Sequence, residues 1–172
     1  MDSFILTGRR GQGKTTVVID SVNVLTRMGM VVSGIAAPVV YTEMRRIGYD
    51  IIDLSSGVRV PWLRTRNNEV SADIGPFFIQ SSGLDIARNA LRNALAVTEG
   101  MVFVDEIGPL EFRNGGHAWF MERFHECSAD MVIMTARPSL AAGINTRWQT
   151  GSGILPIEEI ESVHDLLGIL GG

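Results

Sequence analysis

A glycine-rich octapeptide near the start of the chain carries the strongest chemical signal in the sequence. Residues 8–15 read Gly-Arg-Arg-Gly-Gln-Gly-Lys-Thr and match the phosphate-binding pattern G-x-x-x-x-G-K-[ST]. Glycines let the backbone curl so that its N–H groups point inward around a phosphate chain, and the start of a helix adds partial positive charge. The residues expected to bind a nucleotide are Gly8, Arg9, Arg10, Gly11, Gln12, Gly13, Lys14, Thr15 and Thr16.

Within this loop the side chains have distinct expected roles. We expect Lys14 to contact the β- and γ-phosphates as a catalytic point charge, and Thr15 to place its hydroxyl on Mg²⁺. Lys14 is the only lysine beside fourteen arginines, which reflects either a general bias toward arginine or a position that needs a compact ammonium. Arg9 and Arg10 either add charge near the phosphates or face solvent.

A second signal lies at residues 101–106, where four apolar residues precede two acids. A buried strand that ends in an acid is the usual partner of such a phosphate loop, and Asp105 is expected to hold Mg²⁺ directly or through water. Glu106 is expected to point into the same cleft and to orient or deprotonate an attacking water. Because many buried strands end in an acid, this signal depends on its pairing with the loop.

The elements that must position these residues follow from apolar periodicity. Strands are predicted at residues 4–6, 30–35, 76–80, 101–104, 131–135 and 154–157, and helices at 14–28, 82–98, 117–127 and 160–170. A hairpin is predicted over 48–63, a loop over 142–153, and a capping box between Ser82 and Asp85. Alternating strands and helices predict a single α/β domain over 1–172, with a mainly parallel central sheet and an added antiparallel hairpin.

Composition excludes several classes of protein. The formal charge of −4 argues against a nucleic-acid binder with a broad basic face. One cysteine, Cys127, permits no internal disulfide and no tetrathiolate zinc site. The N-terminus lacks the basic and apolar regions of a signal peptide, and no uncharged stretch is long enough to cross a bilayer. We therefore expect a cytoplasmic protein with no membrane partner.

Two further segments carry a family resemblance. Residues 105–111, Asp-Glu-Ile-Gly-Pro-Leu-Glu, resemble the D-E-I-G-x-[ML]-E signature of the small nucleoside-triphosphatase family first described in thermophiles, which has a human cancer-related member. Residues 42–51 resemble that family's T-E-x-R-x-x-x-x-G-F-x-I segment, with a shorter insert. Since the motifs also follow the family's order, the resemblance covers nearly the whole chain.

The resemblance implies a RecA-like, three-layer P-loop fold with a catalytic glutamate, and slow Mg²⁺-dependent hydrolysis of ATP, GTP and other nucleoside triphosphates. Lys14, Thr15, Asp105 and Glu106 stand at matching positions. Glu111 matches the last acid of the signature and is expected to support the site or cap a helix. The Asn-Arg pair that family members often carry after the last strand, near the base, is absent from residues 156–161.

Arginines supply further catalytic candidates. The resemblance places Arg45 and its neighbour Arg46 near the γ-phosphate, where one could stabilise the transferring charge, while ion pairs with Glu43 or Asp50 are the alternative. Arg137 follows a predicted central strand, at the edge where ligands of such sheets bind, and is either a phosphate contact or the partner of a carboxylate.

Three functions are compatible with these residues. The first is hydrolysis of nucleoside triphosphates with Mg²⁺ as cofactor and water as acceptor. The second is a kinase that moves the γ-phosphoryl to a nucleotide or small metabolite, with arginines forming a lid. The third is a nucleotide-gated switch whose slow turnover times a contact with an unidentified protein partner. An acid beside the strand-end aspartate favours hydrolysis.

Overall fold

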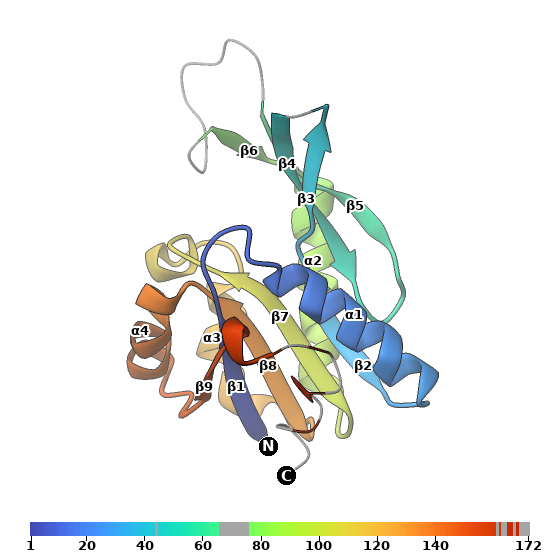
Figure 1. The fold of residues 1–172 in the computed structure, drawn as a ribbon, viewed down its shortest axis with the longest axis vertical. Helices are drawn as coiled ribbons and strands as arrows, with labels where there is room; N and C mark the ends of the chain where they lie inside the picture. Colours follow the sequence, from blue (N-terminus) through green and yellow to red (C-terminus); the bar gives the residue numbers. More distant parts are fainter. Residues whose placement is uncertain (44, 66–75, 161, 163–164, 167, 169–172) are drawn as a thin grey trace.

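A computed structural model describes residues 1–43, 45–65, 76–160, 162, 165–166 and 168. Its strands form one sheet in the order β6-β5-β4-β2-β7-β8-β1-β9, with β3 paired to β4 outside this path (Figure 1). The strands are β1 (Asp2–Thr7), β2 (Val32–Ala36), β3 (Val39–Thr42), β4 (Arg45–Asp53), β5 (Arg59–Thr65), β6 (Phe77–Ile79), β7 (Met101–Ile107), β8 (Met131–Ala136) and β9 (Gly153–Pro156).

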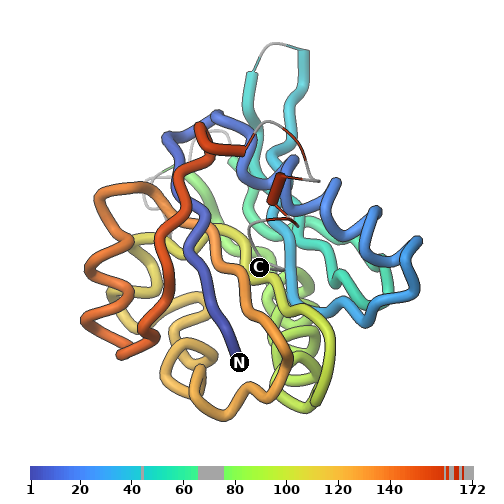
Figure 2. Tube along the Cα trace, turned by 60° about the horizontal axis from the view of Figure 1, so that its bottom comes forward, coloured from blue at the N-terminus to red at the C-terminus, as the bar shows by residue number. Residues whose placement is uncertain are grey.

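The five strands β2, β7, β8, β1 and β9 run parallel to one another and make up one side of the sheet, with β9 at its edge. Figure 2 shows β1, β8 and β7 side by side in the middle of the molecule. All six residues of β8 and the first five of β7 are buried, as expected for parallel strands covered on both faces. The predicted mainly parallel α/β sheet is confirmed.

Helices cover both faces of this sheet. Alternate residues of β7 divide between two cores, since Val102 and Val104 pack with α2 (Ser81–Ala96), whereas Met101 and Phe103 pack with α1 (Lys14–Arg27). The first core also receives α3 (Ala118–Glu122) and α4 (Pro138–Trp148). The helices α1 and α2 therefore lie on opposite faces, which gives the expected three layers (Figure 1).

Small side chains let α2 approach the sheet closely. Its buried face consists of Gly83, Ala87, Ala90, Leu91 and Ala94. The predicted capping box is wrong, because the residue before the helix is Gln80 and no side chain caps the N-terminus. The helix start is instead held against β5, where the Gln80 N–H donates to the carbonyl of Trp62 at 2.7 Å.

The four strands β3, β4, β5 and β6 form an antiparallel extension beside β2. The predicted hairpin over 48–63 is confirmed as β4 and β5, and the Asp53 carboxylate stabilises its turn by accepting hydrogen bonds from Ser55 and Ser56. The extension is larger than the predicted hairpin, because β3 was not expected and the strand predicted at 76–80, found as β6, pairs with β5.

Two other predictions need correction. The loop expected over 142–153 is wrong for its first half, because α4 begins with Pro138 at its first turn and continues to Trp148. The helix expected over 117–127 divides into α3 and a short 3-10 turn, Phe124–Glu126. Most of the helix expected over 160–170 lies outside the described residues. No helix in the described part of the chain has the length and apolar character to cross a membrane.

Candidate active site

The phosphate-binding loop connects β1 to α1, as the motif requires. Gly11 and Gly13 have φ values of 81° and 91°, in the left-handed region that glycine adopts without strain. The Lys14 ammonium donates hydrogen bonds to the carbonyls of Gly8 at 2.9 Å and Arg9 at 3.2 Å. With 6% of Lys14 exposed, its charge is held against the loop, where a phosphate chain would replace these two carbonyls.

The loop also contacts the segment that follows β9. Gln12 Nε2 donates to Glu158 Oε1 at 3.0 Å, and its amide oxygen accepts the N–H of Arg9. A Cβ atom on Gly8 would lie 2.8 Å from Ile157 Cγ2, so this segment packs directly on the loop. The segment after β9 therefore places an acid, Glu158, beside the phosphate-binding loop.

Asp105 precedes Glu106 on β7 and is fully buried. Its Oδ1 accepts the Thr135 hydroxyl hydrogen at 2.5 Å, and its Oδ2 accepts the Ala37 N–H at 2.9 Å. These contacts join β7 to β8 and to the end of β2. Two donors satisfy the buried carboxylate in the way that a buried charge requires.

Glu106 reaches the cavity because β7 bulges. The pairing of β7 with β8 runs from Val104 opposite Met134 to Ile107 opposite Ala136, so Asp105 and Glu106 together face the single residue Thr135. Glu106 has a φ of 68°, which is uncommon for a residue with a side chain. Its N–H donates to Thr135 Oγ1 at 2.9 Å. A bulge of this kind redirects a side chain that regular alternation would place differently.

The electrostatic surroundings of Glu106 combine burial with mixed charge. Burial and the adjacent Asp105 carboxylate raise the pKa of Glu106, while Lys14, Arg137 and Arg10 oppose the rise. A carboxylate with a raised pKa is a stronger base than an exposed one and remains close to cations that attract an anionic substrate.

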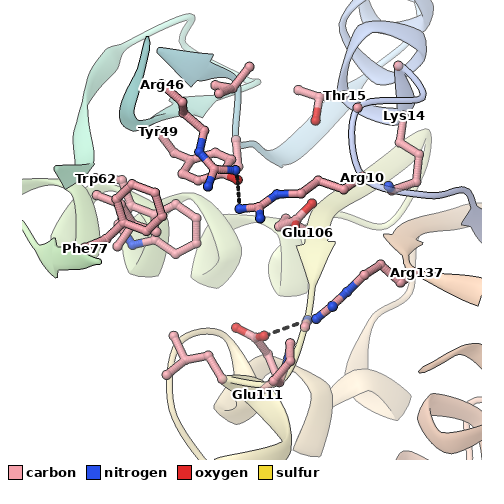
Figure 3. Close-up of a pocket in the computed structure, with 18 of the residues that line it drawn as sticks. Arg10, Lys14, Thr15, Arg46, Tyr49, Trp62, Phe77, Glu106, Glu111 and Arg137 are labelled. Carbon is pink, nitrogen blue, oxygen red and sulfur yellow. Dashed lines mark hydrogen bonds between the residues drawn. The ribbon is translucent and has the colours of Figure 1, made fainter. Parts of the chain in front are cut away.

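A cavity of about 670 Å³ connects the loop and Glu106 with the antiparallel extension. In Figure 3, Arg10 and Glu106 lie between Lys14 at one end and Trp62 and Phe77 at the other. The lining residues are Arg10, Gly11, Gly13, Lys14, Thr15, Thr16, Ala37, Val39, Tyr41, Arg46, Tyr49, Trp62, Leu63, Phe77, Glu106, Gly108, Pro109, Leu110, Glu111, Arg113 and Arg137. This volume falls in the range of small-molecule sites.

Glu111 organises the loop that follows β7. Its buried carboxylate accepts the N–H of Gly108 at 2.8 Å and of His117 at 3.1 Å. Burial raises the pKa of Glu111, and the two N–H donors oppose the rise. These contacts match the supporting role expected for Glu111, whose side chain also borders the cavity.

The structure brings most of the predicted site residues together. Arg10, Gly11, Gly13, Lys14, Thr15, Thr16, Glu106 and Arg137 all line the cavity, whereas Gly8, Arg9, Gln12, Arg45 and Asp105 do not. Arg45 is exposed and lies opposite Thr42 in the antiparallel pairing of β3 with β4, beside the turn that joins these strands. This position gives the expected catalytic role of Arg45 no support.

Of the two neighbouring arginines Arg45 and Arg46, it is Arg46 that lines the cavity. The alternative of an ion pair with Asp50 is not found in the described residues for either arginine, because Asp50 pairs with Arg59 and Arg64. Hydrogen bonds from these two arginines hold the pKa of Asp50 below its usual value although burial opposes them.

Sequence reasoning missed the aromatic end of the cavity and the role of Thr135. Tyr49, Trp62 and Phe77 come from β4, β5 and β6, and only the pairing of these strands brings their rings together. The one available signal is the frequency of aromatic and arginine residues in residues 45–78.

A Mg²⁺ ion fits the donors at the loop. The structure shows no group of three His, Cys, Asp or Glu side chains that could hold a metal, within the part of the chain that it describes. Mg²⁺ at a nucleotide site does not need such a group, because it binds through one or two protein oxygens, water and substrate phosphates. Thr15 lines the cavity, whereas Asp105 is buried outside its lining with both oxygens already hydrogen-bonded.

A glycine-rich loop between β1 and α1, with an acidic pair on β7, defines a P-loop protein with a nucleotide-binding site. A family model described as NTPase matches residues 3–150. The chain belongs to this NTPase family.

Similar proteins agree with this assignment. Nucleoside-triphosphatase THEP1 of Methanopyrus kandleri is 37% identical over 112 residues, which cover 65% of this chain and 61% of that protein. The protein of the same name from Archaeoglobus fulgidus is 32% identical over 117 residues, which cover 68% and 67% of the two chains. The match to the Methanopyrus protein thus spans less than two thirds of its length.

Two solved structures show the same fold. The solution structure of a human cancer-related nucleoside triphosphatase superposes with a TM-score of 0.73 at 23% identity and covers 99% of this chain and 96% of that one. The crystal structure of THEP1 from Aquifex aeolicus gives a TM-score of 0.68 at 20% identity and covers 99% of both chains.

Proposed function

We propose that this protein hydrolyses nucleoside 5′-triphosphates to diphosphate and phosphate, slowly and with Mg²⁺ as cofactor. The observation that carries the proposal is the bulge at Glu106, which directs a half-buried carboxylate into the cavity that Lys14 and Thr15 also line. The family and the names of the similar proteins support it.

Each residue of the site has a defined task in this reaction. The loop N–H groups and Lys14 bind the phosphate chain, so that the γ-phosphate lies beside Glu106. Glu106 accepts a proton from a water molecule as that water attacks phosphorus, and the raised pKa of the carboxyl suits it to this transfer. Arg137 and Arg10 lie close enough to influence Glu106 and add positive charge where phosphate charge is redistributed.

Thr15 and Asp105 are the residues that would hold Mg²⁺. The ion neutralises phosphate charge when it is bound. Thr15 offers a hydroxyl in the cavity, and Asp105 offers a buried carboxylate that Thr135 and Ala37 keep oriented. The formal charge, the single cysteine and the uncharged stretches of limited length support a cytoplasmic protein without nucleic-acid or membrane partners.

Phosphate release tests this proposal. Release from ATP, GTP, CTP and UTP should require Mg²⁺ and should stop when EDTA removes it. Lys14→Ala should weaken triphosphate binding as well as hydrolysis, since the variant lacks the charge at the loop. Tight binding of triphosphates to the wild type without any phosphate release would refute the hydrolase assignment.

A further inference from the structure

The cavity extends well beyond the part that a phosphate chain and a water molecule occupy. We call its far end the aromatic annex, which Arg46, Tyr49, Trp62, Leu63 and Phe77 form. Trp62, Leu63 and Phe77 are buried, and the Tyr49 and Phe77 rings meet edge to face with centroids 5.7 Å apart. These side chains make this end of the cavity largely apolar, which hydrolysis by water does not need.

Two guanidinium groups converge on one oxygen at the entrance to the annex. Arg10 Nη2, from the phosphate loop, and Arg46 Nη1, from β4, each lie 3.1 Å from Tyr49 Oη (Figure 3). The two nitrogens are thus separated by no more than twice that distance. Neither arginine has a carboxylate partner in the described part of the chain. Like charges so close repel each other, and an anion between them would remove the repulsion.

Arg46 is held in this position by the annex itself. Its guanidinium carbon lies 5.1 Å from the centroid of the Phe77 ring and 5.6 Å from that of Tyr49. Cation–π contacts of this kind orient the planar group, and a fixed guanidinium recognises phosphate through paired N–H donors. The charge is therefore preorganised in an otherwise apolar pocket.

The annex lies on the side of Glu106 opposite Lys14 in Figure 3. Under the proposed function, the γ-phosphate lies beside Glu106. The nucleoside of the substrate is attached to the other end of the phosphate chain. The base of the substrate then lies away from the annex. A molecule in the annex would therefore be a second ligand that faces the γ-phosphate.

We propose that the aromatic annex binds a nucleoside monophosphate as a second ligand while a triphosphate occupies the phosphate-binding loop. Its base packs against Trp62 and Phe77, and its phosphate lies between Arg10 and Arg46. Tyr41, 60% exposed, borders the same cavity and offers a further ring at its surface. This inference rests on the proposed function and concerns binding alone.

The charges of the cavity agree with two anionic ligands. Five cationic side chains line it, namely Arg10, Lys14, Arg46, Arg113 and Arg137, against the two carboxylates of Glu106 and Glu111. Mg²⁺ compensates part of the charge of a triphosphate, so this excess of cations leaves positive charge for a second phosphate.

Isothermal titration calorimetry tests the inference in two stages. The protein is first saturated with Mg²⁺ and a non-hydrolysable ATP analogue, and AMP, GMP, CMP or UMP is then added. We expect at least one monophosphate to bind with a stoichiometry of about one. Arg46→Ala should weaken this second event at least about 10-fold while analogue binding persists, because a charge-assisted hydrogen bond is lost. Arg45→Ala is the matched control and should leave the second event unchanged.

The outcomes separate the two proposals. If the analogue binds and none of the four monophosphates binds afterwards, the annex proposal is overturned and the hydrolase assignment is unaffected. Equal weakening in Arg45→Ala and Arg46→Ala would also overturn it, since only Arg46 lines the cavity. Failure of the analogue to bind the wild type would overturn the hydrolase assignment and the annex proposal together.

Discussion

Thr135 donates a 2.5 Å hydrogen bond to the buried carboxylate of Asp105. The same hydroxyl oxygen accepts the N–H of Glu106, so one side chain on β8 orients both acids of β7. The bulge in β7 and the left-handed backbone of Glu106 depend on this contact with a strand about thirty residues further along the chain. Thr135 is therefore a positioning residue for the proposed reaction.

Replacing Thr135 with valine keeps the shape of the side chain and removes its hydroxyl. The Glu106 N–H then loses its acceptor, and Asp105 loses one of its donors. We expect the free energy of unfolding to fall by about 1–3 kcal/mol, the cost of leaving buried polar groups unpaired. Hydrolysis should fall with it, and Thr135→Ser should restore both. Chemical denaturation and phosphate release measure the two effects, and a valine variant equal to wild type would refute the positioning role.

Lys14→Ala tests the electrostatics of the phosphate loop. The variant should bind ATP with Mg²⁺ about 10- to 100-fold more weakly, because charge-assisted hydrogen bonds to phosphate are worth about 1.5–3 kcal/mol. Arg9→Ala removes a neighbouring exposed charge that does not line the cavity, and it should bind nearly as wild type does. Calorimetry measures both affinities, and similar losses in the two variants would indicate a general charge effect instead.

The burial of His117 predicts that the folded protein loses stability in mild acid. It is fully buried, stacks on Trp62 with centroids 5.3 Å apart, and both of its ring nitrogens lack a partner among the described residues. Burial lowers the pKa of His117 from 6.5 to about 4. Between these values only the unfolded chain takes up the proton, so stability is complete above pH 6.5 and falls as the pH drops toward 4.

The expected loss over this interval is about 3 kcal/mol, at about 1.4 kcal/mol per pH unit. His117→Phe keeps a ring against Trp62 and removes the titration. Urea unfolding at several pH values should therefore show a steeper acid loss in wild type than in the variant. Parallel pH profiles for the two proteins would show that His117 is not the cause.

Substitution of Gly34 tests how closely β2 approaches β7. It pairs with Phe103 at a φ of 102°, and a Cβ atom there would lie 2.0 Å from the Phe103 carbonyl oxygen. Gly34→Ala should destabilise the protein by at least about 3 kcal/mol, through steric overlap and backbone strain together. Gly57→Ala is the control, since Gly57 also has a positive φ but open space around it, and should cost only about 1 kcal/mol. Thermal unfolding distinguishes the two variants.

The parallel half of the fold could be predicted from local sequence patterns. Apolar runs identified β1, β7 and β8, and apolar periodicity identified α1, whose buried face includes Val18, Val22 and Leu25. The α4 helix was missed because Gly143, Asn145 and Thr146 are weak helix formers, and packing of the buried Ala141 and Ile144 outweighs that preference.

The site could be predicted only as far as its motifs extend. The loop, Lys14 and Glu106 were expected at the cavity, and the structure places them there. The bulge at Glu106 could not be predicted, because it depends on Thr135 in another strand. The aromatic annex depends on the registers of β4, β5 and β6, which no short motif specifies.

The most direct test of the central claim is single-turnover phosphate release by wild type and Glu106→Gln across pH. Glutamine keeps the shape of the side chain and cannot accept the proton of water, so the rate should fall about 100- to 10,000-fold while triphosphate binding persists. Because the pKa of Glu106 is raised, the wild-type rate should fall as the pH drops through that raised value, and the residual rate of the variant should not. A variant that hydrolyses triphosphates at the wild-type rate, with the wild-type pH profile, would contradict the role of Glu106.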